Sequence, residues 1–132
     1  MKLCSACLLG INCKYNGKNN ANKKIIALSK KEVLIPVCPE QLAGFSTPRE
    51  PMELRNEKVF TASGKDVTKQ MRKGAFETLK IAKIYKIKEA VLKQRSPSCG
   101  FEQLKLSGKV VKGNGITADL LRKNGIKIIS ED

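Results

Sequence analysis

The stretch that decides the fold is a short apolar run followed by a loop with a cysteine. Residues 89–100 read Glu-Ala-Val-Leu-Lys-Gln-Arg-Ser-Pro-Ser-Cys-Gly. An apolar run of this length that ends in turn-forming residues predicts a buried β-strand over Glu89–Lys93. Two earlier segments, Leu3–Cys7 and Val33–Val37, have the same character, and the second is followed by Cys38. We therefore expect three strands that each lead into a cysteine-bearing loop.

Helical patterns lie between and after these strands. The sequence predicts a short helix over Asn20–Lys30, a longer helix over Thr68–Tyr85 and a final helix over Thr117–Lys123, which precedes a fourth strand over Ile126–Ile129. The threonine that starts each of the last two helices is a good N-cap, and Asn124-Gly125 is a typical stop signal. Alternating strands and helices indicate an α/β fold with a mostly parallel sheet.

Two segments lack such patterns. Residues 39–58 contain three prolines and Gly44, which disfavour regular structure and favour a loop that covers a substrate. Residues 101–115 hold three glycines around Val110-Val111. We expect a small hairpin or a glycine-rich loop there, directly before the last helix.

Length and hydropathy define the broad class. A chain of 132 residues suits one domain over residues 1–132. Its hydrophobic content of 41% is ordinary, and no apolar run approaches the roughly 20 residues of a membrane span. The first ten residues carry no export signal. We expect a single-domain cytoplasmic protein that does not enter the membrane.

The charge favours partners that carry phosphate. Lys and Arg number 26 against 12 Asp and Glu, which gives a net charge of +14. Such a charge attracts nucleotides, RNA or DNA. The basic residues are scattered, however, without a compact basic block. Phosphate on a small substrate is therefore expected before nucleic-acid binding as a primary role.

The absence of histidine narrows the chemistry. Without histidine the chain lacks the commonest general base and every Ser-His or Cys-His catalytic pair. Five cysteines in a chain without an export signal favour metal binding or catalysis over disulfides. Ligands of open α/β sheets bind beyond the carboxyl ends of the strands, where Cys7, Cys38 and Cys99 are predicted to converge. Thiolate ligands select iron–sulfur clusters, zinc or copper.

Zinc is the weaker candidate among these metals. A histidine-free zinc site needs four cysteines, usually from two short knuckles. Cys4 and Cys7 form one such knuckle, and a second is missing. The two are also an odd number of residues apart, so in a strand they point to opposite faces. Cys4 is therefore interpreted as a small apolar core residue.

Seven motifs in fixed order, covering nearly the whole chain, resemble those of the thiouracil desulfidase family. They are Ser5-Ala6-Cys7-Leu8-Leu9-Gly10, Asn12-Cys13-Lys14-Tyr15-Asn16-Gly17, Cys38-Pro39-Glu40, Thr47-Pro48-Arg49, Asp66-Val67-Thr68, Ser96-Pro97-Ser98-Cys99-Gly100 and Gly113-Asn114-Gly115-Ile116-Thr117. The resemblance implies a Rossmann-like three-layer α/β domain. It also implies a [4Fe–4S] cluster bound by Cys7, Cys38 and Cys99, and removal of sulfur from a thiouracil-like base without net redox change.

The resemblance further implies Glu40 and Ser96 as acid/base and positioning residues. A cluster held by three cysteines leaves one iron free to act as a Lewis acid on the thiocarbonyl sulfur. In this hypothesis Glu40 takes a proton from the attacking water, and Ser96 holds the base or the water. Arg49 and Ser98 are predicted to be substrate-binding residues. Arg49 would anchor a phosphate or carboxylate, and Ser98, with Gly100, would also shape the loop so that backbone N–H groups bond to cluster sulfurs.

Several alternatives stay open at this point. Cys13 is an alternative to Cys7 as the N-terminal ligand, or an acceptor of the released sulfur. The chain is alternatively a thiol redox enzyme that uses an N-terminal cysteine pair, or a basic RNA-binding module with structural cysteines. A free thiobase, a thionucleotide and a thiolated RNA are all candidate substrates, and the charge favours the phosphorylated ones.

Overall fold

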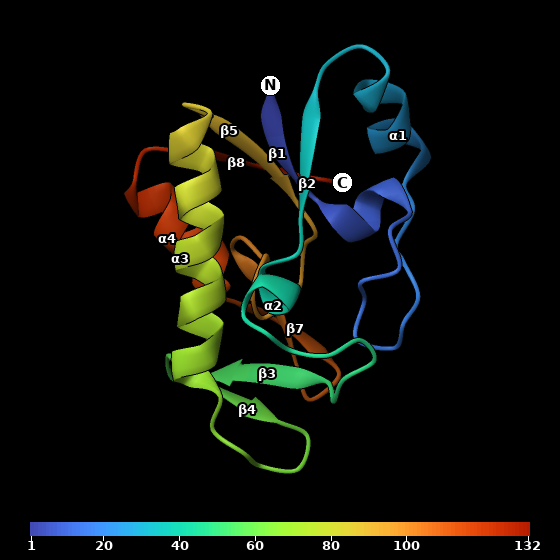
Figure 1. Cartoon of the computed structure of the whole chain (residues 1–132). Coiled ribbons are helices and arrows are strands. Elements are labelled where there is room, and N and C mark those ends of the chain that lie inside the picture. The colour runs from blue at the N-terminus through green and yellow to red at the C-terminus, as the bar shows by residue number, and fades with distance from the viewer.

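A parallel sheet of four strands forms the centre of the computed structural model, which describes residues 1–132 (Figure 1). Its strands are β1 (Lys2–Ser5), β2 (Leu34–Val37), β5 (Glu89–Leu92) and β8 (Lys127–Ser130), in the order β2-β1-β5-β8. All neighbours pair in parallel, so the carboxyl ends of the strands share one edge. The predicted α/β fold with a mostly parallel sheet is confirmed.

Helices cover both faces of this sheet and complete three layers. The long helix α3 (Thr68–Ile84) and the shorter α4 (Ile116–Lys123) lie on one side of the sheet, and α1 (Lys23–Ser29) lies on the other (Figure 1). Leu3 belongs to the core cluster with α3 and α4, whereas its neighbour Cys4 belongs to the cluster with α1. This alternation is the one that strand geometry requires. Cys4 is fully buried, as predicted for a core residue.

The first strand is shorter than predicted. It ends at Ser5, and Ala6–Leu9 form a single turn of 3₁₀-helix, η1, that carries Cys7. Gly10 closes this turn with a φ of 93°, and its N–H bonds to the carbonyl groups of Ala6 and Cys7. A left-handed conformation of this kind suits glycine. The turn places Cys7 at the sheet edge instead of within the strand.

Both predicted threonine caps are wrong. The N-cap of α3 is Val67, while the Thr68 hydroxyl accepts the N–H of Val59 at 2.8 Å. The N-cap of α4 is Gly115, and Thr117 lies one residue inside the helix, fully buried. In each case a tertiary hydrogen bond takes the hydroxyl that the sequence pattern assigned to the helix end.

The segment predicted to be irregular, residues 39–58, contains regular structure. It holds the short helix α2 (Pro39–Leu42) and strand β3 (Met52–Arg55), which pairs antiparallel with β4 (Lys58–Thr61). Asn56 and Glu57, with φ of 49° and 66°, form a two-residue turn between these strands. Pro39 occupies the first turn of α2, where a missing N–H costs nothing.

The hairpin predicted near residues 101–115 is confirmed. Strands β6 (Gln103–Leu106) and β7 (Lys109–Lys112) pair antiparallel. The Ser107 N–H bonds to Glu53 Oε2 at 2.7 Å, which links this hairpin to β3. The two hairpins therefore lie together beyond the carboxyl edge of the parallel sheet (Figure 1). None of the helices combines the length and the apolar surface needed to cross a membrane.

Candidate active site

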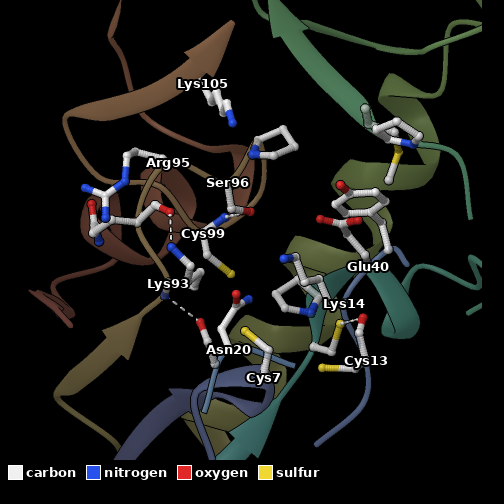
Figure 2. Close-up of a pocket in the computed structure, with 18 of the residues that line it drawn as sticks. Cys7, Cys13, Lys14, Asn20, Glu40, Lys93, Arg95, Ser96, Cys99 and Lys105 are labelled. Carbon is white, nitrogen blue, oxygen red and sulfur yellow. Dashed lines mark hydrogen bonds between the residues drawn. The ribbon is translucent and has the colours of Figure 1, made fainter. Parts of the chain in front are cut away.

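A cavity of about 710 Å³ opens at the carboxyl edge of the parallel sheet. Its walls come from η1, the Cys13 loop, the start of α2, the loop after β5 and both hairpins. Six of the predicted site residues line it, together with the uncertain Cys13: Cys7, Cys38, Glu40, Arg49, Ser96 and Cys99. Figure 2 shows Cys7 and Cys99 facing the same space, with Glu40 and Ser96 on opposite sides of it.

The parallel sheet brings the cysteines together as the strand-end argument predicted. Cys7 lies on η1 after β1, Cys38 lies between β2 and α2, and Cys99 lies in the loop after β5. Cys13 joins them from the loop after η1 and is 2% exposed. All five cysteines of the chain are free thiols, and Cys4 alone does not line the cavity. A redox pair of Cys4 and Cys7 therefore does not fit the site.

The thiols in the cavity differ in proton affinity. A hydrogen bond with Cys13 lowers the pKa of Cys38 to about 6, with further help from the Gln41 N–H and the Arg49 charge. A hydrogen bond with Cys13 also lowers the pKa of Cys7 to about 7. The pKa of Cys13 is raised by these same contacts, so Cys13 keeps its proton and donates it. Burial raises the pKa of Cys99 to about 12.

The donor set fits an iron–sulfur cluster better than a single metal ion. No three Cys, Asp or Glu side chains are grouped tightly enough to hold one ion. A zinc ion needs its thiolates about 2.3 Å from a single centre. A four-iron cluster instead distributes its cysteine ligands over separate irons, so they surround a wider space. Cys7, Cys38 and Cys99, which reach one cavity from three separate segments of a chain without histidine, match that requirement.

Glu40 and Arg49 form a largely buried ion pair beside the cysteines. Arg49 Nε lies 2.8 Å from Glu40 Oε1, and the two side chains are 7% and 14% exposed. Arg49 also donates to the carbonyl oxygen of Cys13 at 2.8 Å, to Thr47 Oγ1 at 3.0 Å and to the Ser46 carbonyl at 3.3 Å. Four of the five N–H groups of this guanidinium are thus used within the chain. Only one is left for a substrate anion.

Ser96 holds the loop that carries Cys99. Its Oγ accepts the backbone N–H groups of Ser98 and Cys99, both at 3.1 Å, and its carbonyl accepts the Gly100 N–H at 2.9 Å. The Ser96 hydroxyl hydrogen is not used by these bonds, because an acceptor oxygen keeps its own O–H. Ser96 therefore combines a local structural role with a free donor at the cavity wall.

Ser98 does not reach the cavity. It is 1% exposed and shares a hydrogen bond of 2.9 Å with the buried hydroxyl of Thr117 in α4. The Ser98 carbonyl accepts the N–H groups of Thr117 and Ala118, at 2.9 and 3.1 Å. A Cβ added to Gly115 would collide with this same carbonyl group. The structure thus places Ser98 between its loop and α4, outside the lining of the cavity.

Sequence reasoning missed the basic and polar rim of the cavity. Lys93 contributes a cation from the end of β5, and its Nζ lies 3.1 Å from Glu131 Oε2. Glu131 also accepts the Gln94 N–H at 2.6 Å, which ties the C-terminal tail to the Cys99 loop. Other polar residues of the rim are Lys14, Tyr15, Asn20, Glu53, Gln94, Arg95, Lys105 and Ser107. The high net charge shows that Lys and Arg side chains are abundant, but no local sequence pattern indicates which of these side chains face the cavity.

Comparisons with known proteins agree with this site. A model of the family described as 2-thiouracil desulfurase matches residues 3–132. An uncharacterized protein, YbbK, from Bacillus subtilis (strain 168) is 43% identical over 145 aligned residues, covering 100% of this chain and 96% of its own length. A solved structure of the [4Fe-4S]-dependent thiouracil desulfidase TudS superposes with a TM-score of 0.93. It is 38% identical, and the match covers 99% of this chain and 90% of that one.

Proposed function

Because the chain belongs to the 2-thiouracil desulfurase family, we propose that it is an iron–sulfur enzyme that removes sulfur from a thiolated nucleobase. The observation that carries the proposal is one cavity that gathers cysteines from three strand ends with a carboxylate and a free hydroxyl. The solved relative at a TM-score of 0.93 is a [4Fe-4S]-dependent thiouracil desulfidase, which supports the same chemistry for this chain.

Cys7, Cys38 and Cys99 are the proposed ligands of a [4Fe–4S] cluster. They come from the ends of three adjacent strands and line one cavity from different sides. Cys13 instead lies within hydrogen-bonding reach of both Cys7 and Cys38. We assign Cys13 the role of a hydrogen-bond donor to the two ligands, since metal-bound side chains are usually held by hydrogen bonds from neighbouring groups. When bound, the cluster supplies a Lewis-acidic iron with affinity for sulfur.

The side chains supply the proton transfers of a hydrolysis. Water adds its oxygen to the ring carbon, the carbon–sulfur bond breaks, and the products are a carbonyl group and hydrogen sulfide. This exchange of one group for another requires no electrons from outside. Glu40 Oε2 has no partner in the chain and is the proposed acceptor of the water proton. Glu40 then gives that proton to the departing sulfur, and the second water proton also leaves with the sulfur as the carbonyl group forms, while the Ser96 hydroxyl orients the base or the water.

The rim favours a substrate with negative charge. Lys14, Lys93 and Lys105 line the same cavity as the cysteines, and Tyr15 offers a ring that is 41% exposed. Aromatic rings stack on nucleobases, and lysines bind phosphate as point charges. We propose that a thiolated base carrying phosphate is the preferred substrate over the free base.

Anaerobic reconstitution tests the proposed function. Protein loaded with iron and sulfide is mixed with thiouracil or its nucleotide, and released sulfide and the loss of thiocarbonyl absorbance are followed together. The expected result is one sulfide per base converted, without added reductant. Turnover that depends on a dithiol reductant would support the thiol redox alternative, and the absence of sulfide release would contradict the proposal.

A further inference from the structure

We infer that Arg49 is a positioning residue that fixes Glu40 for proton transfer, an inference that rests on the proposed function. The ion pair holds Glu40 through one carboxylate oxygen, Oε1, at 2.8 Å from Arg49 Nε. The other oxygen, Oε2, has no partner within the chain and belongs to a side chain that lines the cavity. The guanidinium therefore determines which oxygen is free to meet water.

The hydrogen bonds of Arg49 distinguish this role from anion binding. Its guanidinium donates to Glu40, to the Cys13 carbonyl and to two groups of the Ser46-Thr47 segment. With a side chain 7% exposed and one N–H left, it offers a substrate little surface and no bidentate fork. Arg49 thus acts on the site through Glu40, in contrast to the anchor predicted from the sequence.

Arg49 also sets the distance between Glu40 and the cysteines. Its backbone N–H bonds to the Tyr15 carbonyl at 2.8 Å, and its Nη2 bonds to the Cys13 carbonyl at 2.8 Å. The Sγ of Cys38 lies 3.8 Å from the same Cys13 carbonyl oxygen. One residue therefore joins the Cys13–Tyr15 loop to the start of α2, which carries Glu40 two residues after Cys38.

Only arginine provides these bonds at once. A guanidinium is planar and donates in several fixed directions, whereas a lysine ammonium is a single point with rotatable donors. Lysine at this position keeps the positive charge beside Glu40 and loses the simultaneous bonds to the Cys13 loop. If only the positive charge were needed, R49K would have the kcat of the wild type. If the geometry of the guanidinium is needed, the kcat of R49K lies between those of the wild type and R49Q.

Steady-state kinetics of R49Q, R49K, E40Q and the double variant R49Q/E40Q, all reconstituted anaerobically, test this role. We expect R49Q to lower kcat about 100-fold with KM changed less than about threefold, because a misplaced base slows proton transfer. The iron content and the electron paramagnetic resonance spectrum of the reduced cluster should stay those of the wild type. In the E40Q background, R49Q should lower kcat by less than about threefold, because both changes act on one step. The control is R122Q, which removes an arginine from a surface pair on α4.

The outcomes separate the inference from the proposed function. A wild type that releases no sulfide overturns both. An active wild type with an R49Q variant that keeps kcat, or raises KM alone, overturns the positioning role. Independent, multiplicative effects of R49Q and E40Q on kcat overturn it as well. If R49Q does not fold or does not bind iron, the same comparison of single and double variants is made with R49K, E40Q and R49K/E40Q. Loss of iron in R49K would overturn the inference, because it would show that Arg49 supports the cluster site instead of positioning Glu40.

Discussion

The two walls of the cavity hold their residues by different means. The wall formed by η1, the Cys13 loop and α2 is fixed by side chains, chiefly the Arg49 guanidinium and the Cys13 thiol. The wall formed by the Cys99 loop is fixed by hydrogen bonds to its backbone groups, made by the Ser96 hydroxyl and by the start of α4, on which the loop packs closely. Glu40 lies on the first wall and Ser96 on the second.

The two walls also differ in how they affect the cysteine thiols. Polar contacts on the first wall lower the pKa of Cys7 and Cys38 to about 7 and 6. Burial on the second wall raises the pKa of Cys99 to about 12. An isosteric substitution in a side-chain network changes a few polar contacts and keeps the shape of the site, whereas a Cβ added to a close-packed backbone forces the backbone to move. Apart from the proposed cluster ligands, which lie on both walls, we therefore expect changes in the polar contacts of the first wall to affect turnover, and packing changes on the second wall to affect stability.

Glu40→Gln on the first wall should have the largest effect. The amide keeps the shape of the side chain but cannot accept a proton from water, so kcat should fall by about 10²- to 10⁴-fold. Iron and labile sulfide per chain, measured on the same sample, should match the wild type. Loss of the cluster in this variant would show that Glu40 supports the site structurally, and would contradict the expectation that this change affects turnover alone.

Gly115→Ala on the second wall should give the next largest effect. The added methyl group would meet the Ser98 carbonyl, so the loop and α4 must move apart. Overpacking of this kind costs about 1–3 kcal/mol in the free energy of unfolding. Urea unfolding monitored by circular dichroism measures it. Gly64→Ala, where a Cβ meets nothing but φ is 87°, measures for comparison the cost of backbone strain without a packing clash. Equal stability of Gly115→Ala and the wild type would refute the close packing of this wall.

Ser98→Ala should have a smaller effect that a second substitution relieves. Removing one hydroxyl leaves that of Thr117 buried without its side-chain partner, at a cost of about 1–3 kcal/mol. Replacing both, in Ser98→Ala with Thr117→Val, should restore part of that loss, since paired apolar groups need no hydrogen bond. The kcat of Ser98→Ala should stay within about threefold of the wild type. A rise in KM without loss of stability would instead place Ser98 at the substrate.

The sequence predicted the fold well where short apolar runs dominate. Buried parallel strands are nearly continuous in hydrophobicity, so the segments around Leu3, Leu34, Val91 and Ile128 were recognisable. Parallel strands end at one edge of the sheet, so the loops that carry Cys7, Cys38 and Cys99 were expected to converge. All three cysteines line the cavity. Residues 39–58 were misjudged because a two-stranded hairpin beyond the sheet needs only short, partly polar strands.

Other features depend on contacts between distant residues. Thr117 is a residue type that often caps helices, and its sequence position suggests that role. Only the hydrogen bond between its hydroxyl and Ser98 shows that it links the Cys99 loop to α4 inside the protein. The four internal hydrogen bonds of Arg49, on which the inferred positioning role rests, have no local sequence pattern either. The scattered lysines gave no hint that Lys93 reaches the cavity while paired with Glu131, 38 residues further along the chain. Such pairings follow from the folded topology and leave no local pattern.

The iron content of single cysteine-to-serine variants tests the central claim most directly. After identical anaerobic reconstitution, we expect C7S, C38S and C99S to lose most of their iron and labile sulfide. C13S should keep close to four irons per chain, as expected for a [4Fe–4S] cluster, and so should C4S, whose position lies in the core. Loss of the cluster in C13S together with its retention in C7S would contradict the proposed ligand set.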